Sequence, residues 1–289
     1  MLSYRSLLGL AKPHPLIVAH RGAWHAAPEN TAQAITAAAE RGFEIVEIDI
    51  RRSADGVLFL LHDETLDRMT GITGRAEAFN WDELSQMTLR HGDGGSSAEM
   101  TTLCIPDLES ALLAARNRVC LDLDVKSTRD LEDVAAMVAR LGMTDQVDLK
   151  ITVHTEAQAA ERAALQDRFG VFVMPMTRFE ADNADDRLDL LTRIRAPLVE
   201  AKFDQLSTLA ERKAQFAEAG LRIWINSLDP VACDGLDDSG ALRDPDRVWG
   251  QLVDAGISVI QTDEPEALDL WRQSRDIQQS TDPTRESAA

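Results

Sequence analysis

Long apolar runs, paired cysteines and aromatic side chains are all scarce in this sequence of 289 residues. No apolar run approaches the roughly 20 residues that a membrane-spanning helix needs, so we expect no membrane span. The first 15 residues hold one short leucine-rich run but no long apolar segment with a small-residue cleavage site, which predicts no secretory signal and a cytoplasmic protein. Cys104, Cys120 and Cys233 are odd in number and widely spaced, which argues against a disulfide framework or a cysteine metal cluster and predicts buried, reduced thiols.

Positive charge is scarce as well. The chain has 30 lysines and arginines against 49 aspartates and glutamates, a formal net charge of −19. A field of this sign repels polyanions, so neither nucleic acid nor an anionic membrane surface is an expected partner. An anionic small molecule would need local cations, and besides a bound metal ion the candidates are His20, Arg21, Arg51, Arg52, Arg68 and Lys126. The oligomeric state is left open.

Short apolar runs alternate with helical patterns along most of the chain. With 44% hydrophobic residues, the chain can bury the core of one large α/β domain or of two small ones. Runs followed by helices indicate βα units and a mostly parallel sheet. We expect strands at residues 16–19, 44–50, 57–61, 119–125, 149–154, 171–174, 198–202, 221–226 and 258–261. Their number predicts a TIM-type (β/α)8 barrel in a single domain over residues 1–271.

The second and third predicted strands are an exception to the parallel pattern. Only six residues separate Ile50 from Val57, too few for a parallel crossover, so we expect an antiparallel hairpin that turns at Asp55 and Gly56. If Ala54 faces Val57, counting back along both strands brings His62 opposite Asp49. A register error of one residue would still leave His62 beside the acidic strand.

Two segments depart from the βα rhythm. Residues 64–105 contain several glycines, a helix start at Trp81 and a Gly/Ser stretch at 92–97, and predict a small insertion after the third strand that acts as a lid. Residues 272–289 are polar without an apolar period and are predicted to be disordered. The clearest helices are expected at 31–41 and 206–219, ended by Gly42 and Gly220.

Glu47 and Asp49 occupy alternate positions of an otherwise apolar strand. Their side chains share one face, about 7 Å apart along the chain, where their oxygens could bind one hard cation. The alternative is a pair of surface carboxylates on an edge strand. The surrounding Ile45, Val46 and Ile48 favour a buried strand, where unpaired charge is costly, and therefore a metal site.

Two histidines follow apolar runs in the same way. His20, Arg21 and Gly22 come directly after the first predicted strand, where a barrel strand delivers catalytic residues to its mouth. Gly22 permits a sharp turn, and the planar fork of Arg21 can bind a phosphate in bidentate fashion. Taken alone, His20 could merely bond a loop carbonyl. The parallel placement of His62, with Asp63 behind it, favours a catalytic pair.

The remaining polar candidates carry less specific signals. Asn30 and Thr31 are typical helix N-caps, and Glu29 before them could touch a metal ion or orient a histidine. Asp122, Asp124 and Lys126 share one face of a strand, as further site residues or as a buried ion pair. Asp107 and the Thr262 to Pro265 segment read as helix starts, and plausible pocket walls on later strands are Glu200, Lys202, Trp224 and Asn226.

The order of these motifs resembles the glycerophosphodiester phosphodiesterase family over about residues 16–271. The matching elements are HRG, PENT, E-x-D, HD with the following LDRMTG, an acidic-x-Lys strand, Trp-x-Asn and Thr-Asp-x-Pro. Each is short, but the combination in this order is specific. The resemblance implies a metal-dependent barrel enzyme that uses Mg²⁺ or Ca²⁺ to hydrolyse glycerophosphodiesters to glycerol 3-phosphate and an alcohol.

Carried over position by position, the resemblance also implies residue roles. His20 and His62 match the acid/base pair, Arg21 and Lys126 the phosphate-binding cations, and Glu47, Asp49 and Asp124 the metal ligands. Asp124 departs from the family, whose strand more often has glutamate there, and the shorter arm could shift the ion or admit a water.

The chemistry of a phosphodiester agrees with these roles. Its hydrolysis needs charge neutralisation, a proton acceptor for the nucleophile and a proton donor for the leaving alkoxide. Water or a neighbouring substrate hydroxyl could be the nucleophile. One alternative is a related phosphodiesterase acting on another diester, either of a sugar or inositol or of a lysophospholipid in the manner of the sphingomyelinase D-like enzymes, whose metal ligands are similar. Another is a barrel that binds phosphodiesters without turnover.

Overall fold

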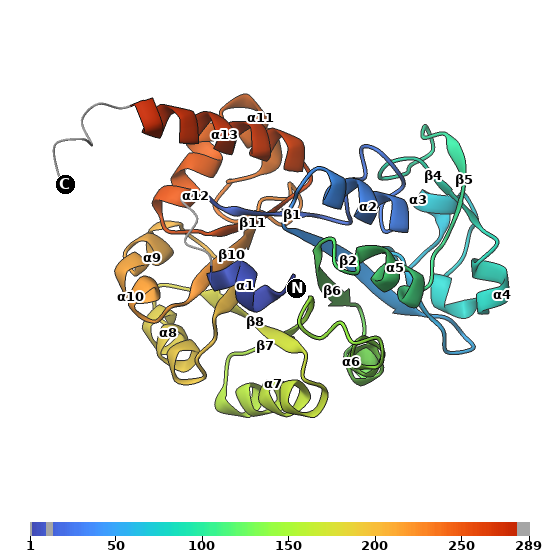
Figure 1. Cartoon of the computed structure of the whole chain (residues 1–289), viewed down its shortest axis with the longest axis horizontal. Coiled ribbons are helices and arrows are strands. Elements are labelled where there is room, and N and C mark those ends of the chain that lie inside the picture. Colours follow the sequence, from blue (N-terminus) through green and yellow to red (C-terminus); the bar gives the residue numbers. More distant parts are fainter. Residues whose placement is uncertain (1, 10–13, 282–289) are drawn as a thin grey trace. The chain divides into compact units, whose positions relative to one another are not determined.

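The computed structural model describes residues 2–9 and 14–281. The chain divides into two compact units, one formed by residues 1–9 and 18–177 and the other by residues 10–17 and 178–289. In both, strands alternate with helices along the chain (Figure 1). Within the described residues, no helix combines the length and apolar character that crossing a bilayer requires.

The first unit is built around parallel strands whose side chains are mostly buried. They are β1 (Leu16–Ala19), β2 (Ile45–Arg52), β6 (Cys120–Val125), β7 (Val147–Thr152) and most of β8 (Phe172–Phe179). The register sets Ile45 opposite both Val18 and Cys120, and Leu123 opposite Leu149. The helices of this framework are α1 (Tyr4–Gly9), α2 (Ala32–Glu40), α5 (Leu108–Ala115), α6 (Leu131–Arg140) and α7 (Glu156–Phe169), with a short 3₁₀ turn η2 (Thr128–Asp130) before α6.

Helix ends in this unit follow the local signals in the sequence. The Thr31 hydroxyl accepts the Ala34 N–H at 3.2 Å and caps α2, and the helix ends before Gly42, whose φ is +82°. Asp107 caps α5 by accepting the Ser110 N–H at 2.8 Å. The predicted helix starts at Thr31 and Asp107 are therefore confirmed.

The predicted hairpin forms, but its register differs by one residue. Strands β2 and β3 (Leu58–Leu60) pair antiparallel with Ile50 opposite Leu60. The Ser53 N–H donates to the Val57 carbonyl at 2.9 Å, so three residues, with Gly56 at φ +97°, make the turn. The turn ends in a left-handed glycine and holds three residues, one more than predicted. Each residue of β2 therefore faces a residue of β3 one position earlier than expected. His62 consequently follows Leu61, which pairs with Asp49 through a 3.2 Å backbone bond.

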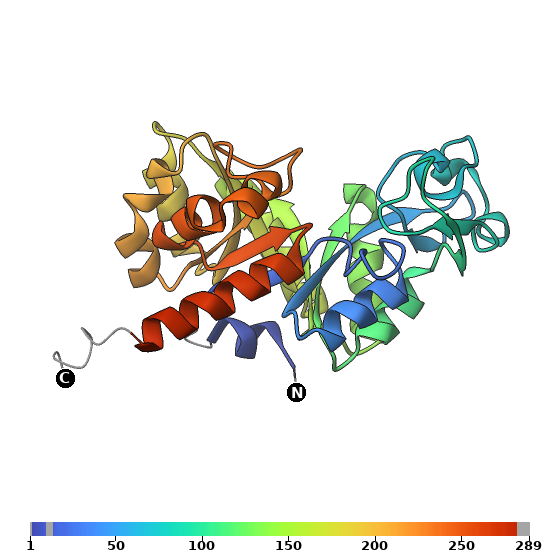
Figure 2. The same cartoon turned by 90° about the horizontal axis from the view of Figure 1, so that it is seen from above.

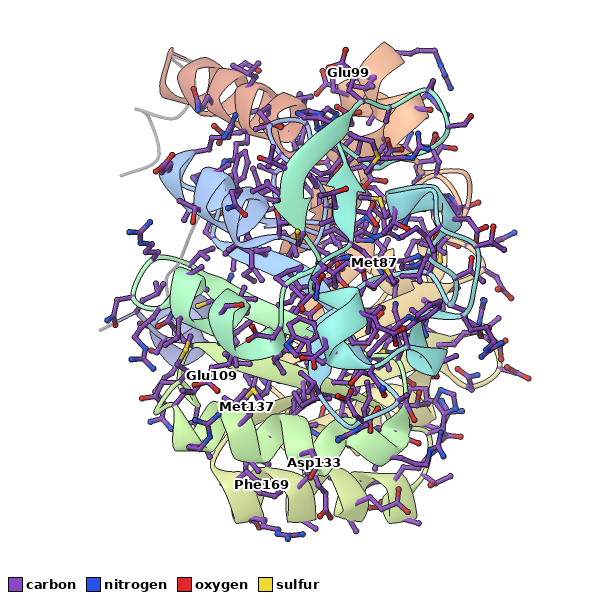
Figure 3. The ribbon with its side chains drawn as sticks, turned by 90° about the vertical axis from the view of Figure 1, so that its right-hand side faces the viewer. Met87, Glu99, Glu109, Asp133, Met137 and Phe169 are labelled. Atoms are coloured by element: carbon purple, nitrogen blue, oxygen red, sulfur yellow. The ribbon has the colours of Figure 1, made fainter. Side chains whose placement is uncertain are left out.

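Residues 64–105 form a small subdomain after β3. It contains α3 (Asp67–Thr70), η1 (Ala76–Ala78), α4 (Trp81–Leu84) and a two-stranded sheet of β4 (Thr88–Arg90) and β5 (Met100–Cys104), which the sequence analysis missed because both strands are short and half-exposed. Figure 3 views this region, where Met87 is labelled. The segment has its own core, which packs on Phe59 of β3 and comprises Leu61, Leu66, Met69, Ala76, Leu84, Met87, Leu89 and Ile105.

The second unit repeats the strand–helix alternation. Its strands are β9 (Leu198–Phe203), β10 (Arg222–Asn226) and β11 (Val259–Thr262), and β10 is parallel to both others. Its helices are α8 (Ala184–Arg193), α9 (Ser207–Ala210), α10 (Lys213–Glu218), α11 (Asp238–Arg243), the π-helical turn η3 (Asp246–Gly250), α12 (Gln251–Asp254) and α13 (Pro265–Thr281).

A buried carboxyl group ties the strand ends of this unit to α11. Asp238 accepts hydrogen bonds from Ser227 Oγ at 2.6 Å, Thr262 Oγ1 at 2.7 Å and the Asp263 N–H at 2.8 Å. Burial raises the pKa of Asp238 to about 7, although these donors oppose the shift. Thr262 Oγ1 also accepts the Glu264 N–H before α13 begins at Pro265, which confirms the predicted start of the last helix.

Two helix predictions in this unit are corrected. Residues 272–281 belong to α13, which Figure 2 shows as one continuous helix, and are not disordered. The aromatic ring of Trp271 packs against Trp249 and anchors this helix, a contact between distant residues that a local pattern does not show. Residues 282–289 lie outside the described residues. The helix expected at 206–219 is divided into α9 and α10 around Arg212, whose guanidinium bonds Asp185 and the Thr208 carbonyl.

Strand pairing gives the order β8-β7-β6-β2-β1 in the first unit, with β3 antiparallel to β2, and the order β9-β10-β11 in the second. Eight strands that alternate with helices along the chain are the TIM-type (β/α)8 connectivity that the sequence predicts, with β3 as the added antiparallel strand. All nine expected strands are present.

The three cysteine thiols are free, as predicted. Cys120 is buried, and burial raises the pKa of its thiol to about 12. Cys104 and Cys233 are half-buried, so their predicted burial is wrong in degree.

Candidate active site

Three carboxylates from two neighbouring strands of the first unit meet in one place. The β2–β6 register sets Glu47 opposite Asp122 and Asp49 opposite Asp124. Oxygen atoms of Glu47, Asp49 and Asp124 all lie within 4.8 Å of one another. Glu47 and Asp49 are 1% exposed, whereas 38% of the Asp124 side chain is exposed, so the group opens to solvent on one side. Hard oxygen donors at this spacing fit a divalent cation such as Mg²⁺ or Ca²⁺.

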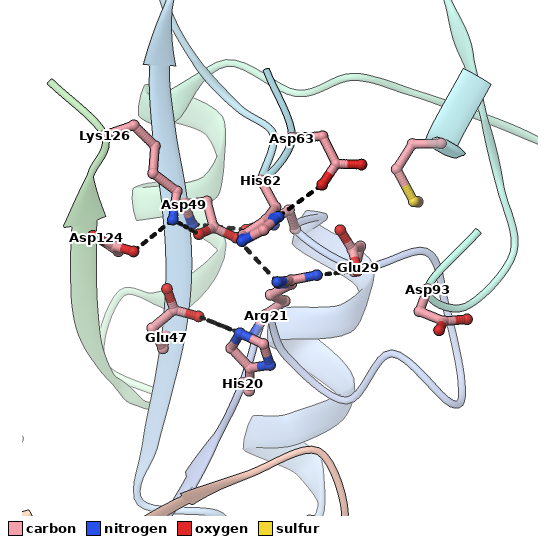
Figure 4. Close-up of polar contacts among 12 residues, drawn as sticks. His20, Arg21, Glu29, Glu47, Asp49, His62, Asp63, Asp93, Asp124 and Lys126 are labelled. Atoms are coloured by element: carbon pink, nitrogen blue, oxygen red, sulfur yellow. Dashed lines mark hydrogen bonds and ion pairs between the residues drawn. The ribbon is translucent and has the colours of Figure 1, made fainter. Parts of the chain in front are cut away.

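Two basic side chains balance part of this charge. Lys126 Nζ lies 2.5 Å from Asp49 Oδ1 and 2.6 Å from Asp124 Oδ2, and Arg21 Nε lies 3.4 Å from Asp49 Oδ2 (Figure 4). Burial alone would raise the pKa of Asp49, but Lys126 and Arg21 hold it below its usual range. Burial raises the pKa of Glu47 to about 8, with Asp49 adding to the shift, so a cation that binds there would displace a proton.

The turn after β1 brings His20 and Arg21 to the carboxylates. His20 Nε2 lies 3.9 Å from Glu47 Oε2, and the Arg21 N–H donates to the same oxygen at 3.2 Å. Arg21 has a φ of +55° and Gly22 a φ of +85°, so the backbone turns sharply. A Cβ at Gly22 would lie 2.8 Å from the backbone of Ala34, which is why only glycine fits beside α2.

The second histidine is held by its neighbour. His62 Nδ1 lies 2.7 Å from Asp63 Oδ1, and 38% of the His62 side chain is exposed. The pKa of Asp63 is lowered by the hydrogen bonds of His62 and Arg68 despite partial burial, so its carboxylate is ionised and can only accept. Nδ1 of His62 therefore carries a proton towards Asp63 and leaves Nε2 for proton transfer. In Figure 4 the His62 ring lies on the Asp63 side of Arg21, and the His20 ring on the Glu47 side.

The PENT segment contributes differently from what its sequence indicates. Thr31 is the helix cap, but Asn30 binds Asp49 twice: Nδ2 donates to Oδ2 at 2.7 Å, and Oδ1 accepts the Asp49 N–H at 2.9 Å. Asn30 is thus an orienting residue for a predicted metal ligand. Glu29 was expected either to touch a metal ion or to orient a histidine. In the structure it accepts hydrogen bonds from Arg21 and Arg68.

For Asp122 of β6, the structure agrees with the alternative of a buried ion pair. Lys150 of β7 lies 2.8 Å from Asp122, and both side chains are buried. Burial opposes ionisation of Asp124, but Lys150 and Lys126 keep its pKa below the usual range. Lys150 was missed as a site residue, although a lysine within the apolar run Leu149-Lys150-Ile151 is a visible signal.

Several predicted cations serve other partners. Arg51 donates to the His62 carbonyl and pairs with Glu77, and Arg52 pairs with Asp130 and Asp133. These arginines therefore support the hairpin and a neighbouring helix and do not join the carboxylate group.

The predicted pocket walls belong to the second unit. Trp224 Nε1 donates to Asn226 Oδ1 at 2.9 Å, and Asn226 Nδ2 donates to Glu200 Oε1 at 3.2 Å. The three side chains form one hydrogen-bonded chain across the paired strands β9 and β10, and of the three only Asn226 lies at a strand end. Lys202 is exposed. Their part in a pocket stays a prediction.

The residues gathered in the first unit supply the chemical groups that hydrolysis of an anionic ester requires. Carboxylates that fit a divalent cation stand beside an arginine, a lysine and two histidines. This set combines charge neutralisation with proton transfer, the two requirements of phosphodiester cleavage.

Comparison with known proteins identifies relatives of this set. The family model described as the glycerophosphoryl diester phosphodiesterase family matches residues 20–182, and a domain of unknown function matches residues 173–271. Glycerophosphodiester phosphodiesterase 1 of Mus musculus is 34% identical over 134 residues, 45% of this chain and 40% of the mouse protein. A Homo sapiens glycerophosphoinositol inositolphosphodiesterase is 42% identical over 83 residues, 26% of this chain and 15% of that protein. The chain thus spans well under half of these curated relatives.

Solved structures agree over nearly the whole chain. A glycerophosphodiester phosphodiesterase from Agrobacterium tumefaciens has a TM-score of 0.63 and 26% identity, and the match covers 89% of this chain and 99% of that one. A Parabacteroides distasonis glycerophosphoryl diester phosphodiesterase has a TM-score of 0.74 at 22% identity, with 93% and 90% covered. An Oleispira antarctica phosphodiesterase in complex with sn-glycerol-3-phosphate has a TM-score of 0.61 at 20% identity, with 90% and 97% covered, and supports the same fold.

Proposed function

This chain belongs to the glycerophosphoryl diester phosphodiesterase family, and on that premise we propose that it hydrolyses glycerophosphodiesters to glycerol 3-phosphate and an alcohol. The observation that carries the proposal is the single cluster of acids, bases and cations in the first unit. It unites three carboxylates, Arg21, Lys126 and two histidines that lie far apart in the sequence. The names of the curated relatives and the product bound to the Oleispira antarctica enzyme support the same reaction.

The carboxylates have the first role in this proposal. Glu47, Asp49 and Asp124 would hold a divalent cation, Mg²⁺ or Ca²⁺, which when bound neutralises phosphate charge and polarises its oxygens. Asn30 fixes the Asp49 carboxylate by two hydrogen bonds and so keeps one ligand in place without the ion. Asp124 is the most exposed of the three.

The cations and histidines have the second role. Arg21 and Lys126 bind the phosphate oxygens, and both are already beside the carboxylates where the phosphate would meet the ion. One histidine removes the proton of the nucleophile and the other protonates the leaving alkoxide. Nε2 of His62 is oriented for this task because Nδ1 is bound to Asp63.

A direct assay tests the proposal. Purified protein with Mg²⁺ or Ca²⁺ is offered glycerophosphocholine, glycerophosphoglycerol and glycerophosphoinositol, and the products are identified by mass spectrometry. We expect glycerol 3-phosphate, loss of turnover in EDTA, and a decrease in kcat of about 100-fold to 10,000-fold in His20→Ala and in His62→Ala. His91→Ala, which removes an exposed histidine of the insertion, is the matched control and should keep its activity.

Two results would contradict the proposal. A metal-replete protein that leaves every diester intact would exclude this activity. Full activity in both histidine variants would exclude the proposed acid/base pair, even if the diesters are cleaved.

A further inference from the structure

Arg68 lies in the insertion, yet its side chain reaches the active-site network. It belongs to α3 and is the third residue of the Leu66-Asp67-Arg68 sequence. Its guanidinium forms hydrogen bonds with two carboxylates, Asp63 and Glu29, and with the Asp93 carbonyl. Arg68 is therefore held by protein groups, as Arg21 and Lys126 are, and the expectation that it could supply a cation to a substrate stays a prediction.

On one side, Arg68 fixes the partner of His62. Arg68 Nε donates to Asp63 Oδ2 at 2.6 Å, and Arg68 Nη2 donates to Asp63 Oδ1 at 3.1 Å. Oδ1 is also the atom that receives His62 Nδ1 at 2.7 Å. A bidentate guanidinium sets both the position and the plane of a carboxylate. The orientation of the His62 ring thus depends on Arg68 through Asp63.

On the other side, Arg68 fixes the partner of Arg21. Arg68 Nη2 donates to Glu29 Oε1 at 2.6 Å, and Arg68 Nη1 donates to Glu29 Oε2 at 3.1 Å. Arg21 Nη1 donates to the same Oε2 atom at 2.9 Å. The Glu29 side chain is 2% exposed. A carboxylate so deeply buried needs both positive partners, because removing one leaves charge that water cannot solvate.

The backbone around Arg68 is also tied to both sides. The Gly95 N–H donates to the Arg68 carbonyl at 2.9 Å, and the Glu29 N–H donates to the Gly92 carbonyl at 2.9 Å. The loop from Gly92 to Gly95 therefore joins α3 to the PENT segment. Arg68 is held in one place by the insertion, which gives it a fixed position from which to orient other groups.

We propose that Arg68 is a positioning residue, which holds His62 and Arg21 in their relative places through Asp63 and Glu29. The inference rests on the proposed phosphodiesterase function and gives the insertion a role in that reaction. A continuous chain of contacts, His62–Asp63–Arg68–Glu29–Arg21, links a proton-transfer group to a phosphate-binding group. The hydrogen bonds of Arg68 to Asp63, Glu29 and the Asp93 carbonyl involve none of Glu47, Asp49 and Asp124.

A double-mutant cycle tests the inference. Misplacing an acid/base group by about 1 Å can reduce turnover about 100-fold, and we expect a loss of this size in kcat for Arg68→Ala. Because Arg68 acts on both His62 and Arg21, the same substitution added to His62→Ala should lower kcat by clearly less than it does in the wild type, and the loss that remains is the part exerted through Arg21. Guanidinium ion in the buffer should restore part of the activity of Arg68→Ala and none of that of His62→Ala.

The chain offers a matched control. Arg75 also lies in the insertion and pairs with Glu64, but both side chains are 63% exposed. Arg75→Ala should change kcat less than about twofold, since an exposed pair contributes little. If Arg68→Ala does not fold, the cycle is run with Arg68→Lys, which keeps the charge but cannot bridge two carboxylates with a planar fork. Failure of both variants to fold would indicate a purely structural role and overturn the inference.

An imidazole spectrum separates this inference from the proposed activity. In ¹⁵N NMR, His62 of the wild type should show the Nδ1–H form, and Arg68→Ala should show a mixture of tautomers. An unchanged spectrum, or kcat losses that simply multiply in the double variant, would overturn the positioning role. The spectrum does not depend on turnover, so it tests Arg68 even if no diester is cleaved.

Discussion

Asn30 exerts its effect through a neighbour, because both of its amide atoms bind Asp49. It donates to the Asp49 carboxylate and accepts the Asp49 N–H while its own backbone adopts a φ of +56°. Asparagine tolerates this left-handed conformation better than most residues. Its amide therefore satisfies the turn and orients a predicted metal ligand at the same time.

We predict that Asn30→Ala weakens Mg²⁺ or Ca²⁺ binding about tenfold, because partners that orient metal ligands contribute this much to affinity. The free energy of unfolding should fall by about 2 kcal/mol from the lost hydrogen bonds and the strained φ. Titration calorimetry and urea denaturation measure the two effects. Asn183 makes the same pair of bonds to Glu180, so Asn183→Ala should lower stability without changing metal affinity. Equal metal affinity in wild type and Asn30→Ala would contradict the prediction.

At the same scale, the candidate site residues could be named from the sequence and their partners could not. His20 and Lys126 directly follow strands and Glu47 lies within one, each as part of a short motif, which is a local signal. The pairing of Lys150 with Asp122 depends on β6 and β7 being neighbours, and no pattern within either strand specifies it. Asn30 was assigned to a helix cap because caps and orienting residues use the same side chains.

Among the elements, the turn between β1 and α2 depends on one glycine. Gly22 and Gly42 flank α2 with almost the same φ, +85° and +82°. A Cβ at Gly22 would lie 2.8 Å from Ala34, whereas a Cβ at Gly42 would meet nothing within 4 Å. The two positions therefore separate backbone strain from steric contact.

Gly42→Ala should lower the free energy of unfolding by about 1 kcal/mol, the effect of a left-handed backbone on alanine. Gly22→Ala adds a clash and should lower it by about 3 kcal/mol, and it should also lower kcat because His20 and Arg21 precede the turn. Urea denaturation and steady-state assays measure both. Equal losses of stability in the two variants would show that close packing on Ala34 has no effect.

The hairpin shows how far a sequence pattern can place an element. Apolar alternation and the Asp55-Gly56 pair predict the antiparallel strands and the place of the turn. They do not distinguish a two-residue from a three-residue turn, because both place glycine at the end. Only the Ser53 to Val57 hydrogen bond decides between them, and it shifts the register by one residue.

At the scale of the whole molecule, the net charge of −19 opposes the approach of anions. Raising ionic strength from about 0.01 M to about 0.1 M shortens the Debye length from about 30 Å to about 10 Å. We predict that this change raises kcat/KM for anionic glycerophosphoglycerol roughly twofold relative to zwitterionic glycerophosphocholine. Parallel assays of both diesters at fixed metal concentration measure the ratio. A ratio that falls with salt would mean that local cations, and not the net charge, control capture.

Several molecule-wide predictions stay predictions. They are the single domain over residues 1–271, the lid role of the insertion, the cytoplasmic location and the choice between Mg²⁺ and Ca²⁺. The barrel connectivity, in contrast, is confirmed, and the carboxylate group that could hold the ion is present.

The sequence by itself determined the nine predicted strands but not β4 and β5, several helix ends and most of the candidate groups of the site. These features depend on residues a few positions apart, so alternation, caps and turns specify them locally. Tertiary structure alone decided which polar and charged groups meet: Arg68 with Glu29, Lys150 with Asp122, and Asn30 with Asp49. Such pairs join residues that are distant in the chain, and they form because burial makes an unpaired charge costly wherever the fold has brought the two together.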